Sequence, residues 1–89
     1  MPTIRIRVAP LLYSYTGGLR TVEVEASTVG DAISALDRRF PGAGFRVVDE
    51  QGGIRPHVNI FVGEENVRSL MAPVQAGAEI YIVGALSGG

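Results

Sequence analysis

Residues 21–42 read TVEVEASTVGDAISALDRRFPG, and the hydrophobic period changes in the middle of this stretch. Its first five residues alternate between polar and apolar, which predicts a half-buried strand with Val22 and Val24 inward. From Thr28 onward the apolar residues recur at the spacing of one helix face. That face consists of Val29, Ala32, Ile33, Leu36 and Phe40.

Both ends of this helix carry recognisable signals. Thr28 is a typical N-cap, and Asp31 in the first turn meets the positive end of the helix dipole. Pro41-Gly42 predicts the end of the helix. A strand followed directly by an amphipathic helix is a unit that packs the helix across a sheet.

Three further segments alternate in the same way as residues 21–25. They are residues 3–8, 57–62 and 79–83. Gly17-Gly18 suits a hairpin loop between the first two strands. Residues 63–66 and Ala76-Gly77 are predicted turns, and Val67-Arg68 is expected to pair back briefly. Residues 41–56 form a long connection, in which we expect a short helical turn or a packed flap.

The order of these elements is strand, strand, helix, strand, short strand, strand. It fits one sheet best if the first and last strands lie side by side and parallel. That is the α+β β-grasp (ubiquitin-like) arrangement. We expect a single domain over residues 1–84 and a flexible C-terminal tail over residues 85–89.

Composition excludes several classes of protein. The chain has 89 residues, no cysteine, one histidine and a net charge of −1. Disulfides and thiol chemistry are excluded, and binding of nucleic acid through bulk charge is not favoured. We expect no metal site and no bound cofactor. No apolar run approaches 18 residues and no signal-peptide pattern is present, so we expect a cytoplasmic protein.

The chain's polar groups offer no local signature of catalysis. His57 begins a predicted strand, and no nucleophile or orienting partner stands near it in the sequence. The acidic pairs Asp49-Glu50 and Glu64-Glu65 fall in predicted turns. We interpret all of them as structural or solvated side chains.

Glycine occurs in pairs at three places, and the last pair ends the sequence as Gly88-Gly89. A terminal pair has no turn to make, so it is either an inert tail or cloning remnant, or part of a reactive end. In the second interpretation the α-carboxylate of Gly89 enters another enzyme's active site. Glycine lacks Cβ and can thread a narrow channel. Five extended residues, Ala85, Leu86, Ser87, Gly88 and Gly89, reach roughly 17 Å.

The alternation also predicts what the sheet face without a helix carries. Arg5, Arg7, Phe61, Tyr81 and Val83 fall on that face. Apolar groups rimmed by arginine suggest a docking patch for a partner, and scattered exposed apolar side chains are the alternative. The chain also lacks lysine and cysteine, so an activated C-terminal acyl group would meet no side-chain amine or thiol on its own chain.

Taken together, these segments resemble the bacterial ubiquitin-like sulfur carrier proteins. That family includes the molybdopterin synthase small subunit, the thiamine-pathway carrier and the carrier of cysteine biosynthesis. The last of these is the most similar. The resemblance covers nearly the whole chain, and one difference is Gly84, where members often have proline. Its specific parts are residues 16–18, residues 58–68, residues 76–80 and Gly88-Gly89.

The resemblance implies a reaction cycle in which the chain is a cosubstrate with no active site of its own. A ubiquitin-activating-type adenylyltransferase uses ATP to adenylate the Gly89 carboxylate. A sulfurtransferase or sulfide then supplies sulfur, and the resulting thiocarboxylate donates it to a biosynthetic enzyme. The acceptor pathway is left open.

Two other functions are compatible with the same pattern. A ubiquitin-like modifier would join Gly89 to lysines of target proteins, and a β-grasp binding module would carry an inert tail. Free thiocarboxylate, isopeptide adducts, or indifference to removal of Gly88-Gly89 would distinguish the three.

Overall fold

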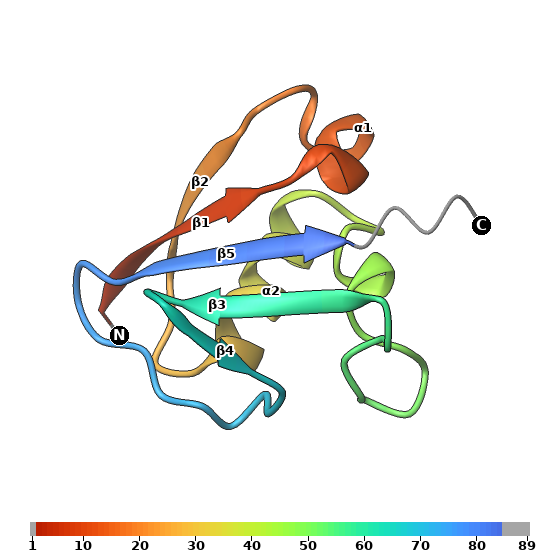
Figure 1. Ribbon diagram of the computed structural model, residues 1–89. Helices are drawn as coiled ribbons and strands as arrows, with labels where there is room; N and C mark the ends of the chain where they lie inside the picture. Colours follow the sequence, from red (N-terminus) through yellow and green to blue (C-terminus); the bar gives the residue numbers. More distant parts are fainter. Residues whose placement is uncertain (1, 85–89) are drawn as a thin grey trace.

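The computed structural model describes residues 2–84, which form a five-stranded sheet with one long helix across one face (Figure 1). The strands are β1 (Thr3–Val8), β2 (Thr21–Glu25), β3 (Val58–Val62), β4 (Glu65–Val67) and β5 (Glu79–Gly84). The helical segments are η1 (Pro10–Leu12), α1 (Tyr13–Thr16), α2 (Val29–Arg39) and η2 (Gly44–Arg46). The strand order is β2-β1-β5-β3-β4.

The first and last strands lie in the middle of the sheet and run parallel, with Ile6 opposite Ile80. Every other pairing in the sheet is antiparallel. The β-grasp arrangement predicted from the sequence is therefore confirmed. The long connection between these two parallel strands includes α2, which lies across one face of the sheet.

One face of the sheet packs against α2, and its side chains follow the predicted parity. The inward residues of the four longer strands are all buried, and they are Ile4, Ile6, Val8, Val22, Val24, Val58, Ile60, Ile80 and Ile82. From α2, Val29, Ala32 and Leu36 are fully buried and Ile33 nearly so. Alternation in the strands and the 3.6-residue period in the helix thus bring two apolar surfaces together.

The start of α2 is the predicted one. Thr28 has extended backbone angles, and its side-chain oxygen accepts a hydrogen bond of 3.1 Å from the amide of Asp31. That bond satisfies one of the amides that a helix N-terminus leaves without a partner.

The end of α2 differs by one residue from the predicted stripe. The helix ends at Arg39, and Phe40 is its C-cap with φ −131° and ψ 84°. Phe40 is half-buried rather than part of the fully buried stripe. The ring of Pro41 disfavours helical angles in the residue before it, which explains the early end.

The predicted turn at residues 63–66 is shorter in the structure. Val62 pairs with Glu65, so only Gly63 and Glu64 form the turn. Gly63 has φ +62°, the left-handed value that favours glycine at the first position of a two-residue hairpin. The short strand β4 is therefore Glu65–Val67, and the expectation that Arg68 pairs in it was wrong.

Two connections contain structure of their own. Residues 41–56 include η2 and bury Ala43 and Val47, which confirms the expected short helical turn. Between β1 and β2 the sequence predicted only a glycine loop. Instead η1 and α1 precede Gly17, and Thr16 is buried with its hydroxyl donating to the carbonyl of Leu19 at 2.8 Å.

Candidate functional site

The described chain stops at Gly84, the last residue of β5, which is where the predicted reactive tail begins. Gly84 lies opposite Val58, the first residue of β3. The candidate residues Ala85, Leu86, Ser87, Gly88 and Gly89 lie outside the described residues. The site can therefore be built from its base and from the sheet face that leads to it.

The face of the sheet away from α2 is the near face in Figure 1, and the strand register places a row of residues across it. Arg7 lies opposite Tyr81 in the parallel pair β1 and β5. Tyr81 lies opposite Phe61 across β5 and β3, and Phe61 lies opposite Asn66 across β3 and β4. Phe61 and Tyr81 are both half-buried. Directly opposed side chains in a sheet are in contact distance, so these residues form one surface.

Val83 extends this surface towards the tail. It lies one residue before Gly84, two residues beyond Tyr81 on the same face, and opposite Asn59. The Asn59 side-chain oxygen accepts a bond of 3.4 Å from Asn66, so two amides border the apolar groups on the β4 side. We call Arg5, Arg7, Phe61, Tyr81 and Val83 the open-face patch. The structure brings all five onto one face.

The two arginines of the patch have different surroundings. The Arg7 guanidinium stacks over the Tyr81 ring, 4.9 Å from its centroid. It is therefore held against the apolar surface by a cation–π contact. Arg5 lies between Glu23 and Glu79 in the strand register, so acidic neighbours flank it. The cationic character of the patch is concentrated at Arg7.

The other chemistry-bearing side chains do not form a site. His57 is exposed in the turn directly before β3. Hydrogen bonds from the backbone amides of Gly53 and Gln51 hold the pKa of Asp49 below its usual range. This carboxylate therefore organises a loop. Within residues 2–84, no group of three or more histidine or acidic side chains is arranged to hold a metal ion.

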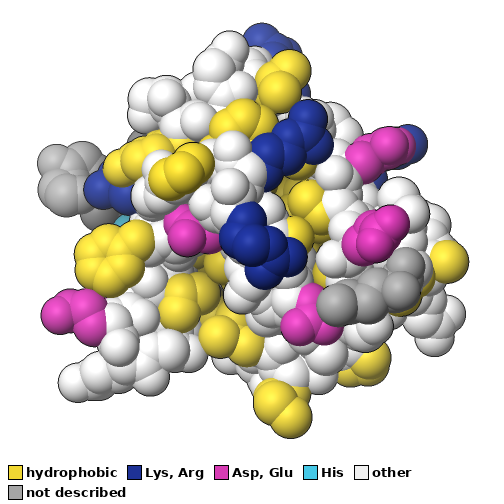
Figure 2. All heavy atoms as spheres, turned by 180° about the vertical axis from the view of Figure 1, so that it is seen from behind, with side chains coloured by type: hydrophobic (Ala, Val, Ile, Leu, Met, Phe, Trp, Pro, Cys, Tyr) yellow, Lys and Arg dark blue, Asp and Glu magenta, His cyan; other side chains and the backbone are white. Residues whose placement is uncertain are grey.

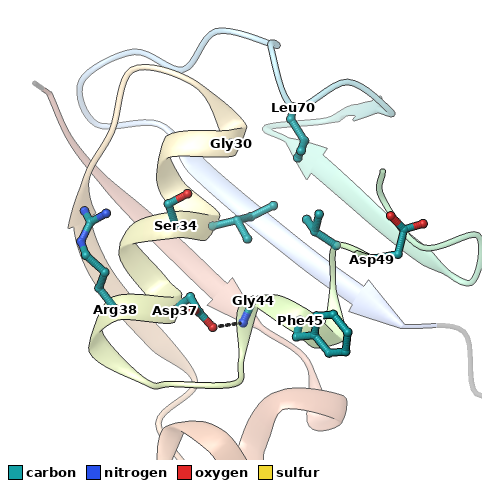
Figure 3. Close-up of a pocket in the computed structure, with 10 residues that line it drawn as sticks. Gly30, Ser34, Asp37, Arg38, Gly44, Phe45, Asp49 and Leu70 are labelled. Atoms are coloured by element: carbon teal, nitrogen blue, oxygen red, sulfur yellow. Dashed lines mark hydrogen bonds between the residues drawn. The ribbon is translucent and has the colours of Figure 1, made fainter. Parts of the chain in front are cut away.

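A shallow groove of about 420 Å³ lies on the opposite side of the molecule, between α2 and η2 (Figure 3). Asp37 borders it, but the Asp37 carboxylate already accepts bonds from the amides of Gly42 at 3.1 Å and Gly44 at 2.9 Å. A Cβ at Gly44 would come within 2.9 Å of the Asp37 side chain, so only glycine fits there. On this side, hydrophobic side chains are interrupted by arginine and acidic groups (Figure 2). The groove is thus a product of loop packing.

Sequence reasoning missed one residue close to the base of the tail. The Arg68 side chain bonds to three backbone carbonyls in residues 54–58. An arginine after a short strand carries no local signal of such bonds, because their partners lie ten or more residues away in the chain.

Comparisons with known proteins agree with this architecture. The model of the ThiS family matches residues 11–89. The sulfur carrier protein CysO of Mycobacterium tuberculosis is 30% identical over 91 residues, which cover 97% of this chain and 98% of the relative. The same values hold for CysO of Mycobacterium bovis.

Solved structures extend the likeness to three dimensions. A chain of the Amycolatopsis orientalis BexX/CysO complex superposes with a TM-score of 0.89 at 30% identity, covering 97% of this chain and 99% of that one. SAMP1 of Haloferax volcanii superposes with a TM-score of 0.81 at 29% identity, covering 98% and 99%.

The β-grasp sheet, its open face and the strand that ends at Gly84 define a ubiquitin-like protein. The chain belongs to the ThiS family, and it is a sulfur carrier protein of the ThiS and CysO type. It is thus a cosubstrate rather than an enzyme, and carriers of this family bind no cofactor. Within residues 2–84, no helix has the length and apolar character needed to cross a membrane.

Proposed function

We propose that the carrier works through the α-carboxylate of Gly89, activated by a ubiquitin-activating-type adenylyltransferase. A carboxylate oxygen attacks the α-phosphorus of ATP, and pyrophosphate leaves. Hydrosulfide, or a sulfurtransferase acting as its source, then adds to the acyl carbon and AMP leaves. The product is a thiocarboxylate on Gly89, whose sulfur a biosynthetic enzyme accepts.

The observation that carries this proposal is the double role of β5. Tyr81 and Val83 present side chains on the open face, and the same strand ends at Gly84. A partner that binds the patch therefore also fixes the point from which residues 85–89 depart. The reach of those five residues, roughly 17 Å, is enough to cross the wall of an active site.

We infer that the open-face patch is the docking surface for the adenylyltransferase. Phe61 and Tyr81 are opposed aromatic side chains that are only half-buried, and aromatic groups of this kind dominate binding free energy when a partner covers them. Arg7 adds a cation that is already held against Tyr81. Arg5 completes the rim and supplies a charge between two acidic neighbours.

The proposal also assigns the parts of the chain and its place in the cell. Residues 1–84 are the docking domain and residues 85–89 are the reactive tail. ATP and the enzymes of sulfur transfer act in the cytoplasm, so we place the carrier there. Ser87 and Gly88 are small residues that suit a narrow channel, and Ala85 and Leu86 complete the threading segment.

Deletion of Gly89 tests the chemical assignment. The deletion moves the carboxylate back by about 3.4 Å, and misplacements near 1 Å can cost about 100-fold in rate. ATP–pyrophosphate exchange with the cognate adenylyltransferase should therefore collapse, while binding and thermal stability stay at the wild-type level. Gly88→Val should act similarly through its branched Cβ, with Gly88→Ala as the milder control. Wild-type exchange in the truncated protein would exclude Gly89 as the acyl donor.

A second function is favoured by the likeness to SAMP1, which is a small archaeal modifier protein. In a modifier the same acyl-adenylate chemistry ends with attack by a lysine amine, forming an isopeptide bond. Intact mass spectrometry after incubation with ATP, sulfide and the adenylyltransferase separates the two outcomes. A gain equal to replacement of one oxygen by sulfur marks the carrier, and isopeptide adducts at target lysines in cell extract mark the modifier.

A further inference from the structure

Phe45 is the middle residue of η2, and its side chain is 53% exposed. The packing of η2 does not depend on this ring, because Ala43 and Val47 on its two sides are fully buried in the core. Single exposed apolar side chains are common on protein surfaces, and Met71 is even more exposed. What distinguishes Phe45 is how its ring is held.

The side chain of Arg55 contacts Phe45 in two ways. Its Nε donates to the Phe45 carbonyl at 2.8 Å, and its guanidinium lies over the Phe45 ring, 4.8 Å from the centroid. The Arg55 amide donates to the carbonyl of Val47 at 2.9 Å, and the Arg55 carbonyl accepts a bond of 3.2 Å from Arg68. An aromatic group that is fixed before a partner arrives loses less conformational entropy on binding, so this ring is preorganised for recognition.

This pair of residues lies at the end of the sheet where β5 finishes. The Arg55 carbonyl also accepts a bond of 2.9 Å from the amide of Val58, which lies opposite Gly84. Figure 1 shows η2 beside the end of β5, and Figure 3 shows Phe45 at that same end, on the side of the sheet that α2 covers. The end of β5 therefore has the open-face patch on one side and Phe45 on the other.

The length of the chain beyond Gly84 limits how far away a partner can be. Five residues follow Gly84, and fully extended they span at most roughly 17 Å. A protein that holds the Gly89 carboxylate in its active site must come within that distance of Gly84, so its surface approaches the side chains around the end of β5. This limit depends on the number of residues alone.

We propose that Phe45, held in place by Arg55, is a second anchor for the adenylyltransferase, separate from the open-face patch. This inference rests on the proposed function at Gly89. The adenylyltransferase is the occupant because it already covers the open face beside Gly84, and its contact area needs only to extend around the end of β5. Arg55 lies over one face of the ring, so the enzyme contacts the other face and the ring edge through an apolar pocket.

Calorimetry with the cognate adenylyltransferase in the absence of ATP measures docking apart from the chemical step. Phe45→Ala should weaken the affinity by about tenfold, as expected for a buried aromatic anchor, with little change in Tm because the ring is exposed in the free carrier. Met71→Ala is the matched control. It removes a more exposed apolar side chain from the connection that leads into the start of β5, at the other end of this strand, and it should leave the affinity unchanged.

The role of Arg55 is tested by a double-mutant cycle. Arg55→Gln should weaken the affinity by about threefold in the wild-type background and have little further effect in Phe45→Ala, because Arg55 acts through the position of the ring. Arg55→Lys keeps a cation without the forked geometry and should fall between the two. Equal losses in both backgrounds would overturn the positioning role of Arg55.

The second anchor itself is overturned if Phe45→Ala binds the adenylyltransferase with wild-type affinity, or if Met71→Ala loses as much affinity as Phe45→Ala. Unchanged affinity for the adenylyltransferase with weaker binding of the sulfur-accepting enzyme would assign Phe45 to that enzyme instead. A wild-type dimer in sedimentation that Phe45→Ala disrupts, again with unchanged affinity, would assign it to a second copy of the chain. Either result would contradict the occupant proposed above.

Pyrophosphate exchange keeps the proposed function separate from this inference. A wild-type carrier that binds the adenylyltransferase but supports no exchange of pyrophosphate into ATP would contradict activation at Gly89. In that event the affinity of Phe45→Ala still decides whether the ring is an anchor for the enzyme.

Discussion

The two faces of the sheet use neighbouring residues of the same strands for different purposes. On the face covered by α2, Ile60 and Ile82 are fully buried. One residue further along each strand, Phe61 and Val83 are only half-buried on the open face. The buried core and the proposed docking surface are thus separated by a single residue step along each strand.

The physical reason lies in what each face still exposes to water. Apolar groups already buried against α2 have nothing further to gain from a partner. Covering the half-buried aromatic pair Phe61 and Tyr81 with a partner would stabilise the complex by about 25 cal/mol per Å² of apolar surface removed from water. Mutations on the covered face should therefore lower stability, whereas mutations on the open face should mainly weaken partner binding.

The largest expected effect is on the covered face. Leu36→Ala should lower the free energy of unfolding by about 2–5 kcal/mol, because it empties a fully buried position between α2 and the sheet. Urea denaturation measures the change. Ser34→Ala, at an exposed position of the same helix, is the control and should change stability by less than about 0.5 kcal/mol. A loss below about 1 kcal/mol for Leu36→Ala would contradict the packing described for α2.

The neighbouring pair Ile60 and Phe61 tests the separation of faces directly. Ile60→Ala should cost about 2–4 kcal/mol in stability and leave the affinity of the folded protein for the adenylyltransferase unchanged. Phe61→Ala should weaken that affinity by more than about 1 kcal/mol and cost less stability than Ile60→Ala. Calorimetric binding and thermal unfolding measure the two quantities. Equal stability losses with unaltered binding would assign Phe61 to the core.

A smaller loss of stability is expected at Thr28, the N-cap of α2. This helix covers one face of the sheet and leaves the other open. Thr28→Ala removes the acceptor for the Asp31 amide and should cost about 1 kcal/mol. Thr28→Ser retains a hydroxyl and should stay close to wild type. Chemical denaturation of both variants checks this, and a cost equal to that of Leu36→Ala would mean that the helix depends on its cap more than on its packing.

The smallest effect belongs to Asp49, which lies on neither face. Amides of Gly53 and Gln51 donate to its carboxylate and lower its pKa below the reference value of 3.8. A lowered pKa in the folded state adds stability that is present above the reference value and lost as pH falls through the folded pKa. Asp49→Asn should therefore lower Tm slightly at neutral pH and not at the acid end. NMR titration of the carboxyl group checks the direction, and a pKa above 3.8 would contradict it.

Much of the fold was accessible from local patterns. Strand alternation fixed which residues face α2, and the capping signal at Thr28 placed the start of the helix. The predicted helix extended one residue beyond the observed end at Arg39. Pro41 disfavours helical angles at Phe40, and this effect is not visible in the apolar period. The segments η1 and α1 were missed because they are short and carry no repeating apolar period.

The candidate site, too, could be predicted from the sequence only in part. The open-face patch could be assembled from the sequence because parity places its five residues on one face, and the register then brings Arg7, Tyr81 and Phe61 into one row. The hydrogen bonds of Arg68 could not be predicted, because their carbonyl partners are ten to fourteen residues away and lie in a turn whose shape depends on packing.

By itself the sequence determined the alternation of the strands and the amphipathic helix, since both are patterns among residues close in the chain. It also contained the terminal Gly88-Gly89. Only the tertiary structure decided the register of the predicted parallel pair β1 and β5, which places Ile6 opposite Ile80. The same is true of the bonds from Arg68 to the carbonyls of residues 54–58. Hydrogen bonds between distant segments form only after the apolar faces have packed. The position of Gly84 at the end of β5 is therefore a property of the whole fold.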